Sequence, residues 1–230
     1  MQQWRISSMS IFSQHFSPSD RLPKGTRGFT LIELLVVIGI VVIISSLILF
    51  NTQGFNSAIL LRSLAYEVGL SFREAQLYGV AVRETAPGTN NFGAAYGVYF
   101  PASIIGVDNA NYPLFEDLND NGIFDDGASS VLENFTIQNG FTLKNLCAAQ
   151  GSSLTCAQAC PSPLPTGITA CTGTPLQWLA VTFKRPDPDA IIRTDVSSNP
   201  YSEAYVIVQS QNGTTREVTV SETGQIVIGD

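Results

Sequence analysis

Charged residues are scarce in this 230-residue chain, because Asp, Glu, Lys and Arg together make up 13% of it against a usual share of roughly 25%. With 44% apolar residues, the composition excludes a disordered polyelectrolyte. The chain has 12 basic and 19 acidic residues, for a net charge of −7. An acidic body lacks the basic surface that neutralises phosphates, so we expect no nucleic-acid binding by the core fold.

Histidine is almost absent, since His15 is the single one. The sequence also lacks a Gly-x-Ser-x-Gly elbow, a phosphate-binding loop and a His-Glu-x-x-His motif. Asp187 and Asp189 flank Pro188, which is typical of a solvated turn and not of an acid/base pair. We therefore expect no enzyme and no required cofactor, with a membrane-anchored hydrolase as the weakest alternative.

Positive charge is concentrated before a long apolar run. The first 28 residues carry a net charge of +3, from four basic residues against one aspartate, and the remainder carries −10. Residues 29–50 follow, and they are apolar apart from Thr30, Glu33, Gly39 and two serines. A helix of this length at about 1.5 Å per residue spans a bilayer core. The preceding cations predict a cytoplasmic N-terminus and an extracytoplasmic C-terminal body.

Glu33 distinguishes this run from simpler membrane segments. A secretory signal peptide has an apolar region of about 7 to 15 residues and a small-residue cleavage site, which this run does not show. A plain signal anchor leaves Glu33 unexplained, because a carboxylate in the membrane costs about 2.5 to 3.5 kcal/mol. Either Glu33 reaches the interface along its own stem or another group pairs with it.

The residues from Lys24 to Ile38, KGTRGFTLIELLVVI, resemble the leader motif of type IV prepilins and type II secretion pseudopilins. The resemblance implies recognition through Lys24 and Arg27, cleavage by a prepilin peptidase between Gly28 and Phe29, and N-methylation of Phe29. It implies that Glu33 is the assembly glutamate, which meets the terminal amine of a neighbouring subunit. The removed leader would be residues 1–28, or 20 residues if translation starts at Met9.

The same resemblance implies a location and partners. The chain would sit in the bacterial inner membrane as a single-pass protein, with a cytoplasmic N-terminus and an extracytoplasmic head, before it enters a filament. Its partners would be the prepilin peptidase, other pilin or pseudopilin subunits, the inner-membrane assembly platform and, before assembly, the lipid bilayer.

Helical periodicity continues after the apolar run, over residues 51–86. An apolar or small stripe steps by four and three residues, and it comprises Leu61, Ala65, Val68, Phe72, Ala75, Gly79 and Val82. The charged residues lie mostly off this stripe, at Arg62, Glu67, Arg73, Glu74 and Arg83. The pattern predicts an amphipathic helix that docks on a sheet, with a short coiled-coil contact as the alternative.

Residues 87–230 predict a β-rich head. Short runs rich in Val, Ile, Tyr, Phe and Thr favour strands near 96–100, 103–107, 131–137, 141–146, 178–183, 190–194, 203–210, 215–220 and 225–228. Asn212-Gly213 between two alternating runs predicts a hairpin, which the last strand extends to a meander. We therefore expect an α+β fold, in which the C-terminal half of a long N-terminal helix packs against an antiparallel sheet.

The order of motifs in this head resembles the pseudopilin H and FimT-like minor pilin group. The resemblance rests on residues 96–100, the loop at 117–127, residues 178–187 and residues 216–226. The stretch 145–174 has no counterpart in that group and is expected to be an insertion.

The loop region at 116–128 has the spacing of a calcium-binding loop. Asp117, Asn119 and Asn121 occupy relative positions 1, 3 and 5, Gly122 position 6, the carbonyl of Ile123 position 7 and Asp125 position 9. Position 12 is Ala128 instead of glutamate, so Asp126 or Glu133 would have to complete the ligands. The alternative is an Asx-rich turn whose side chains bind their own backbone.

The four cysteines are Cys147, Cys156, Cys160 and Cys171, all within one stretch. Their spacing has no Cys-x-x-Cys unit and no nearby histidine, which argues against zinc. Two disulfides are expected outside the cytosol, and three pairings are open.

Two functions follow from these patterns. The first is a minor pilin or pseudopilin, a structural subunit without enzymatic activity. The second is a binding module that the filament or the membrane presents to DNA, a surface or a secreted substrate, with residues 145–174 as the candidate contact.

Overall fold

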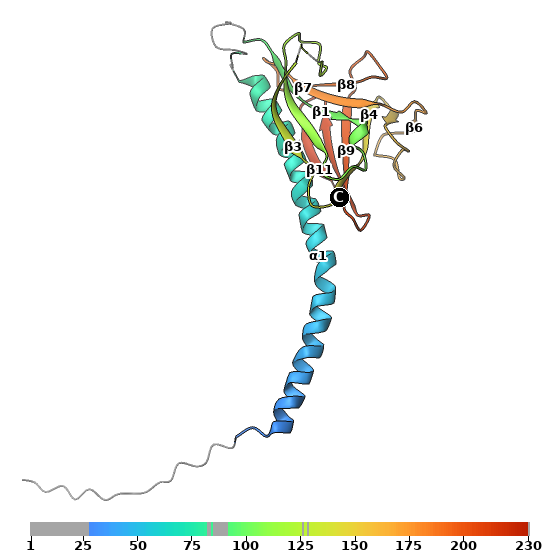
Figure 1. Cartoon of the computed structure of the whole chain (residues 1–230). Coiled ribbons are helices and arrows are strands. Elements are labelled where there is room, and N and C mark those ends of the chain that lie inside the picture. The colour runs from blue at the N-terminus through green and yellow to red at the C-terminus, as the bar shows by residue number, and fades with distance from the viewer. Residues whose placement is uncertain (1–27, 82–83, 85–91, 126, 128, 230) are drawn as a thin grey trace, which may run out of the picture. The chain divides into compact units, whose positions relative to one another are not determined.

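A computed structural model describes residues 28–81, 84, 92–125, 127 and 129–229, without the side chains of residues 50–56. The elements in chain order are α1 (Leu31–Val80), β1 (Ala95–Pro101), the short 3-10 helix η1 (Ala102–Ile104), β2 (Asn111–Asp117), β3 (Ser129–Thr136), β4 (Thr142–Gln150), β5 (Ser153–Cys156), β6 (Ala170–Cys171), β7 (Trp178–Phe183), β8 (Ala190–Thr194), β9 (Glu203–Gln209), β10 (Thr215–Ser221) and β11 (Ile226–Gly229) (Figure 1). The chain divides into two compact units, residues 1–47 and residues 48–230.

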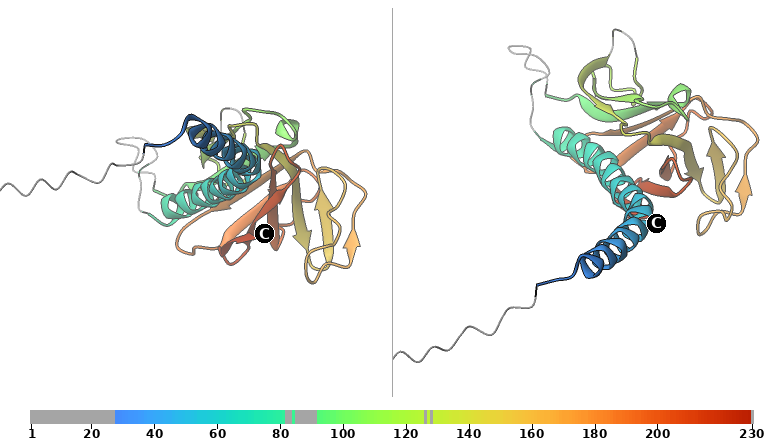
Figure 2. Two further views of the ribbon diagram at one scale, coloured as in Figure 1. Left: turned by 90° about the horizontal axis from the view of Figure 1, so that it is seen from below. Right: turned by 60° about the horizontal axis from the view of Figure 1, so that its bottom comes forward.

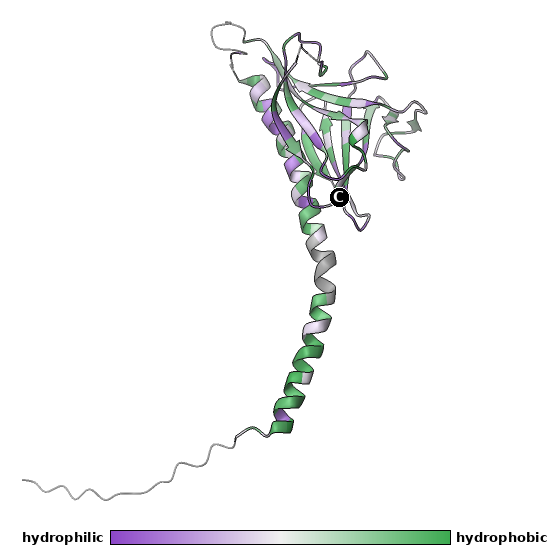
Figure 3. Cartoon of the chain, viewed as in Figure 1, coloured by the Kyte–Doolittle hydropathy of each residue, from purple (hydrophilic) through white to green (hydrophobic). Residues whose placement is uncertain are grey.

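The described part of the first unit is the apolar beginning of α1. The helix is predominantly hydrophobic there (Figure 3), and Glu33 is the one charged residue among residues 31–47. All the side chains of residues 31–47 are exposed, which a soluble monomer would not tolerate for so many large apolar groups.

The second unit contains two sheets and the C-terminal part of α1 (Figure 2). The first sheet has the order β3-β2-β1-β7-β8 and is antiparallel throughout. The second has the order β11-β10-β9-β4-β5-β6, and its pair β5 and β6 is parallel. The α+β class is confirmed, but the head has two sheets where the strand pattern alone suggested one.

The predicted helical stripe is the side of α1 that faces the core. Its members Leu61, Ala65, Val68, Phe72 and Ala75 are all fully buried. They share one hydrophobic cluster with β1, β2, β7 and β8 of the first sheet and β4, β9 and β10 of the second. The docking prediction is therefore confirmed as far as the stripe is described, since its last member, Val82, lies outside the described residues.

The helix is shorter than the predicted 29–86. It begins at Leu31 and ends at Val80, and neither Ala81 nor Glu84 is helical. Pro87 disfavours a helix that continues through the residue before it, so the sequence limits the helix at this end. The close approach at Gly79 also brings the last turn directly onto β7.

Most of the predicted strands are present, and one is wrong. Residues 178–183 and 190–194 form β7 and β8 as predicted, and the C-terminal meander is formed by β9, β10 and β11. Residues 103–107 form no strand, because η1 and Gly106, with a φ of 76°, turn the chain away after β1. Ile105 makes a single bridge to Leu143 there.

Strand β2 was not predicted, and it contains Pro113, a residue that disfavours a central strand. The ladder explains why proline is tolerated. β1 pairs with β2 from Asp117 to Leu114 and stops there, so no β1 carbonyl needs the N–H that Pro113 lacks. β2 continues beside β3 on its other edge, where Pro113 lies opposite Asn134.

Gly79 offers a direct test of the helix–sheet contact. A Cβ added at Gly79 would overlap the carbonyl oxygen of Phe183 and lie 2.7 Å from its carbonyl carbon. We expect Gly79→Ala to lower the free energy of unfolding by about 2 kcal/mol, because backbone cannot move aside as a side chain can. The measurement is denaturant unfolding of the detergent-solubilised chain, followed by Trp178 fluorescence in a Trp4→Phe background.

Gly69→Ala is the matched control on the same helix. Its added Cβ would lie 3.1 Å from the flexible Cδ1 of Ile228, and helix propensity favours alanine by about 1 kcal/mol. Equal stability of the two variants would contradict the close backbone contact at Gly79.

Candidate functional site

The apolar helix starts with an N-cap at Thr30. The Glu33 N–H donates to Thr30 Oγ1 at 3.3 Å, and the Leu34 N–H donates to the Thr30 carbonyl at 3.1 Å. Thr30 and Glu33 have the Thr-x-x-Glu spacing of a capping box, of which the Glu33 N–H to Thr30 bond is formed. A carboxylate in the first turn is also favoured by the positive end of the helix dipole. The sequence analysis assigned Glu33 to assembly and missed this local role of Thr30, although the spacing shows it.

The predicted cleavage position lies directly before this cap. Gly28 and Phe29 are not helical, Phe29 is exposed, and no atom lies within 4 Å of a Cβ built on Gly28. A peptide bond in exposed, non-helical chain is accessible to a protease. Lys24 and Arg27 fall outside the described residues, so their part in recognition stays a prediction.

The helix that follows is long and apolar enough to cross a membrane over Leu31–Leu49. Glu33 lies within it, exposed and one turn from Phe29. Its placement at the start of the span leaves the carboxylate accessible to a cation on another molecule.

The Asp/Asn/Gly loop is organised around Asp117. This carboxylate is fully buried at the end of β2, and it accepts backbone N–H bonds from Asp120 at 2.8 Å and from Gly122 at 2.6 Å. Burial raises the pKa of Asp117, while the backbone hydrogen bonds act in the opposite direction. The predicted loop boundary at 116 is wrong, because Glu116 and Asp117 are strand residues.

The other predicted calcium ligands of the described loop also bind within it. Asp125 Oδ2 accepts from the Asn121 amide at 2.5 Å and from the Asn119 amide at 3.4 Å, and Asn121 Oδ1 accepts the Ile123 N–H at 2.8 Å. Asp126 lies outside the described residues. Among the described residues, no three His, Cys, Asp or Glu side chains are grouped as a metal site. The contacts are those of an Asx-rich turn, and calcium binding stays a prediction.

Phe124 shows what this loop does in the fold. Its ring lies 5.0 Å from Tyr99 and 5.3 Å from Phe115, measured between centroids. Asp120 pairs with Lys184 just after β7. The loop therefore covers the face of the first sheet that is turned away from the helix. The sequence analysis missed Phe124, although a lone aromatic in a polar loop was a signal for an anchor.

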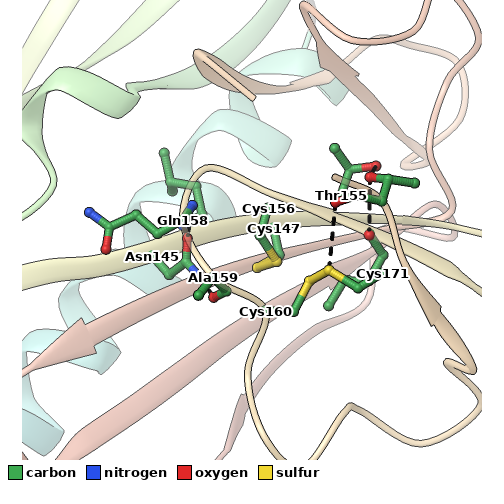
Figure 4. Close-up of a disulfide and its surroundings, with 11 residues drawn as sticks. Asn145, Cys147, Thr155, Cys156, Gln158, Ala159, Cys160 and Cys171 are labelled. Atoms are coloured by element: carbon green, nitrogen blue, oxygen red, sulfur yellow. Dashed lines mark hydrogen bonds between the residues drawn. A yellow bond between two sulfur atoms is a disulfide. The ribbon is translucent and has the colours of Figure 1, made fainter. Parts of the chain in front are cut away.

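The four cysteines form two disulfides, Cys147–Cys156 and Cys160–Cys171 (Figure 4). The first joins directly paired positions of β4 and β5. The second ties residues 157–169 to β6. Both bridges adjoin a small buried cluster with Ala149, Leu154 and Tyr205 on the second sheet.

The predicted insertion 145–174 begins inside the second sheet. Residues 145–150 are the last six residues of β4, and Cys147 and Ala149 are buried. That the stretch is an insertion stays a prediction. Asn145 holds the next segment in place, since its amide donates to the Ala159 carbonyl at 2.9 Å and its Oδ1 accepts the Gln158 N–H at 3.0 Å (Figure 4). Residues 157–169 are the part of this stretch that lies outside the strands, and the role of the stretch as a contact surface stays a prediction.

Replacement of Asp117 tests whether the loop is organised by its carboxylate. We expect Asp117→Ala to lower the free energy of unfolding by about 2 kcal/mol, because the buried N–H of Gly122 and the part-buried N–H of Asp120 lose their acceptor. Asp117→Asn keeps one acceptor oxygen and should lose less. The exposed Asp187→Ala is the control, and an equal effect there, by the same fluorescence assay, would contradict the assignment.

Comparison with known proteins identifies one segment of the chain. Residues 23–49 match the prokaryotic N-terminal methylation motif. No curated protein and no solved structure matches the chain. The matched segment includes Lys24 and Arg27, the Gly28–Phe29 bond, the cap and the apolar helix up to residue 49. The chain thus carries the N-terminal methylation motif of prepilins on an apolar helix that continues into an α+β head.

Proposed function

We propose that this protein is a minor pilin or pseudopilin, a non-enzymatic structural subunit of a type IV pilus or a type II secretion pseudopilus. The observation that carries the proposal is the methylation motif at residues 23–49, placed on a helix whose apolar side chains at residues 31–47 are exposed in the described part of the chain. Prepilin peptidase cleaves after Gly28, Phe29 is N-methylated, and the helix moves from the bilayer into a filament.

The charge distribution supports an inner-membrane intermediate. The net charge of +3 before the helix holds that end in the cytoplasm, and the head is extracytoplasmic. Two disulfides in the head agree with an oxidising compartment. The assembly platform and other pilin subunits then take the subunit from the membrane.

Glu33 is the residue that we assign to assembly. Cleavage creates an α-amino group at Phe29, and a buried carboxylate is tolerated when a cation pairs with it. Glu33 and Phe29 of one chain lie at the same end of the helix. Packing of neighbouring helices at similar depth brings the carboxylate of one subunit to the amine of the next.

A minor role, close to pseudopilin H or the FimT-like pilins, is the subclass that we favour. The support is the head itself, with two sheets and a disulfide-bonded segment at residues 157–169. Such a segment suits a specialised subunit better than a densely repeated one.

The N-terminus of the mature protein tests the proposal. We expect a chain that begins with N-methyl-Phe29 in cells that contain a prepilin peptidase, and a full-length chain in cells that lack it. Intact mass and N-terminal sequencing measure this. A chain that starts at Met1 or Met9 in both strains, or one that is cut near residue 50, would refute the proposed class.

Glu33→Ala separates assembly from processing. We expect normal cleavage at Gly28, because the substitution lies beyond the scissile bond, and at least tenfold less of the subunit in sheared filaments, because an unpaired amine is left in an apolar core. The measurement is immunoblotting of membrane and filament fractions. Ser45→Ala, on the same helix, is the control and should assemble normally. Normal incorporation of Glu33→Ala would sink the assignment.

A further inference from the structure

The side of α1 that faces away from the sheets carries a second apolar stripe. Its members remain exposed in the head unit: Ile59 by 53%, Tyr66 by 48%, Leu70 by 65%, Leu77 by 64% and Val80 by 42%. On a helix with 100° per residue, these positions lie within about 80° of one another and opposite the buried stripe. Single exposed apolar residues are ordinary, but an aligned series over six turns is not.

The spacing of this stripe is that of a coiled-coil seam. Ile59, Tyr66 and Val80 fall on d positions, and Leu70 and Leu77 on a positions. Ser63 and Arg73 complete the seam. Two helices that pack through such a/d positions lie nearly parallel or antiparallel to each other.

The charges beside the seam decide between these two directions. Arg62 occupies the g position on one flank, and Glu67 the following e position on the other. Among the described residues neither forms an ion pair within the chain, and Arg62 lies over the Tyr66 ring at 5.7 Å. In a parallel pair, a g residue meets the e residue five positions later on its partner. Two equivalent contacts then form, each between Arg62 of one copy and Glu67 of the other. An antiparallel pair would instead place g positions opposite g positions and e positions opposite e positions, so Arg62 would not meet Glu67.

The surface beside Glu67 has space for the partner's cation. A hollow of about 170 Å³ lies between the helix and the connection from β3 to β4, and Ser63, Glu67, Thr136 and Gln138 help to line it. Its polar lining suits a guanidinium group, which needs several oxygen acceptors.

We propose that this face of α1 binds a second copy of the same chain, parallel and in register, with Arg62 of each copy against Glu67 of the other. The inference rests on the proposed function, because insertion into one membrane gives all copies the same direction. It goes further in assigning a second interface, within the head and separate from the apolar helix start.

Disulfide trapping tests the proposal on the full chain in membranes, where the native cysteines are already paired. We expect Ile59→Cys and Leu77→Cys each to form a covalent homodimer on mild oxidation. Differently tagged Ile59→Cys and Leu77→Cys chains should not cross-link to each other, since about 27 Å separates the two positions along a helix. Val131→Cys, with a comparably exposed apolar residue on β3, is the control and should stay monomeric.

Charge reversal gives the second measurement. Arg62→Glu or Glu67→Arg alone should lower the Ile59→Cys dimer fraction about two- to fivefold, and the double reversal should restore it. Equal trapping of Val131→Cys, cross-linking between Ile59→Cys and Leu77→Cys, or no rescue would overturn the proposal. So would a cross-link to another pilin instead of this chain, identified by mass spectrometry.

The same samples separate this failure from failure of the proposed function. A chain that is correctly processed to Phe29 but gives no Ile59→Cys dimer would refute the second interface alone. A chain that is not processed would refute the pilin-like function itself.

Discussion

The head depends on the contact between the C-terminal half of α1 and the two sheets. Five small or apolar residues from Leu61 to Ala75 insert into a single cluster with strands of both sheets. Phe72 meets Phe100 of β1 at a ring distance of 5.8 Å, and Phe100 stacks in turn on Tyr112 of β2. Neither sheet closes the core alone, so the helix stabilises both and places them relative to each other.

Polar contacts fix the position of the helix along this core. Gln76 is buried, and its amide donates to the carbonyls of Pro188 and Gly224 at 2.9 and 3.0 Å. These two carbonyls belong to connections that follow β7 and β10. One side chain therefore ties the last turns of α1 to both sheets, and a shift of the helix would leave buried polar groups unpaired.

Loops cover the outer faces of the sheets. Phe124 brings the Asp117 loop onto the first sheet, and Ile168 and the Cys160–Cys171 bridge bring residues 157–169 onto the second. Strands β1 and β9 are consequently buried on both faces for most of their length. Helix α1 differs from these strands in that only one of its sides is covered. Its side away from the sheets keeps an exposed apolar seam that nothing in the described chain covers.

The sequence by itself determined the features whose signals are local. The apolar run and the leader motif follow from consecutive residues, the buried stripe of α1 from a helical period, and the hairpin at Asn212-Gly213 from two turn residues between alternating strands. Tertiary structure alone decided the rest. The division into two sheets, the toleration of Pro113, the disulfide pairing and the internal hydrogen bonds of Asp117 depend on residues far apart in the chain. Their energies come from contacts that exist only once the core has formed, so no short stretch of sequence specifies them.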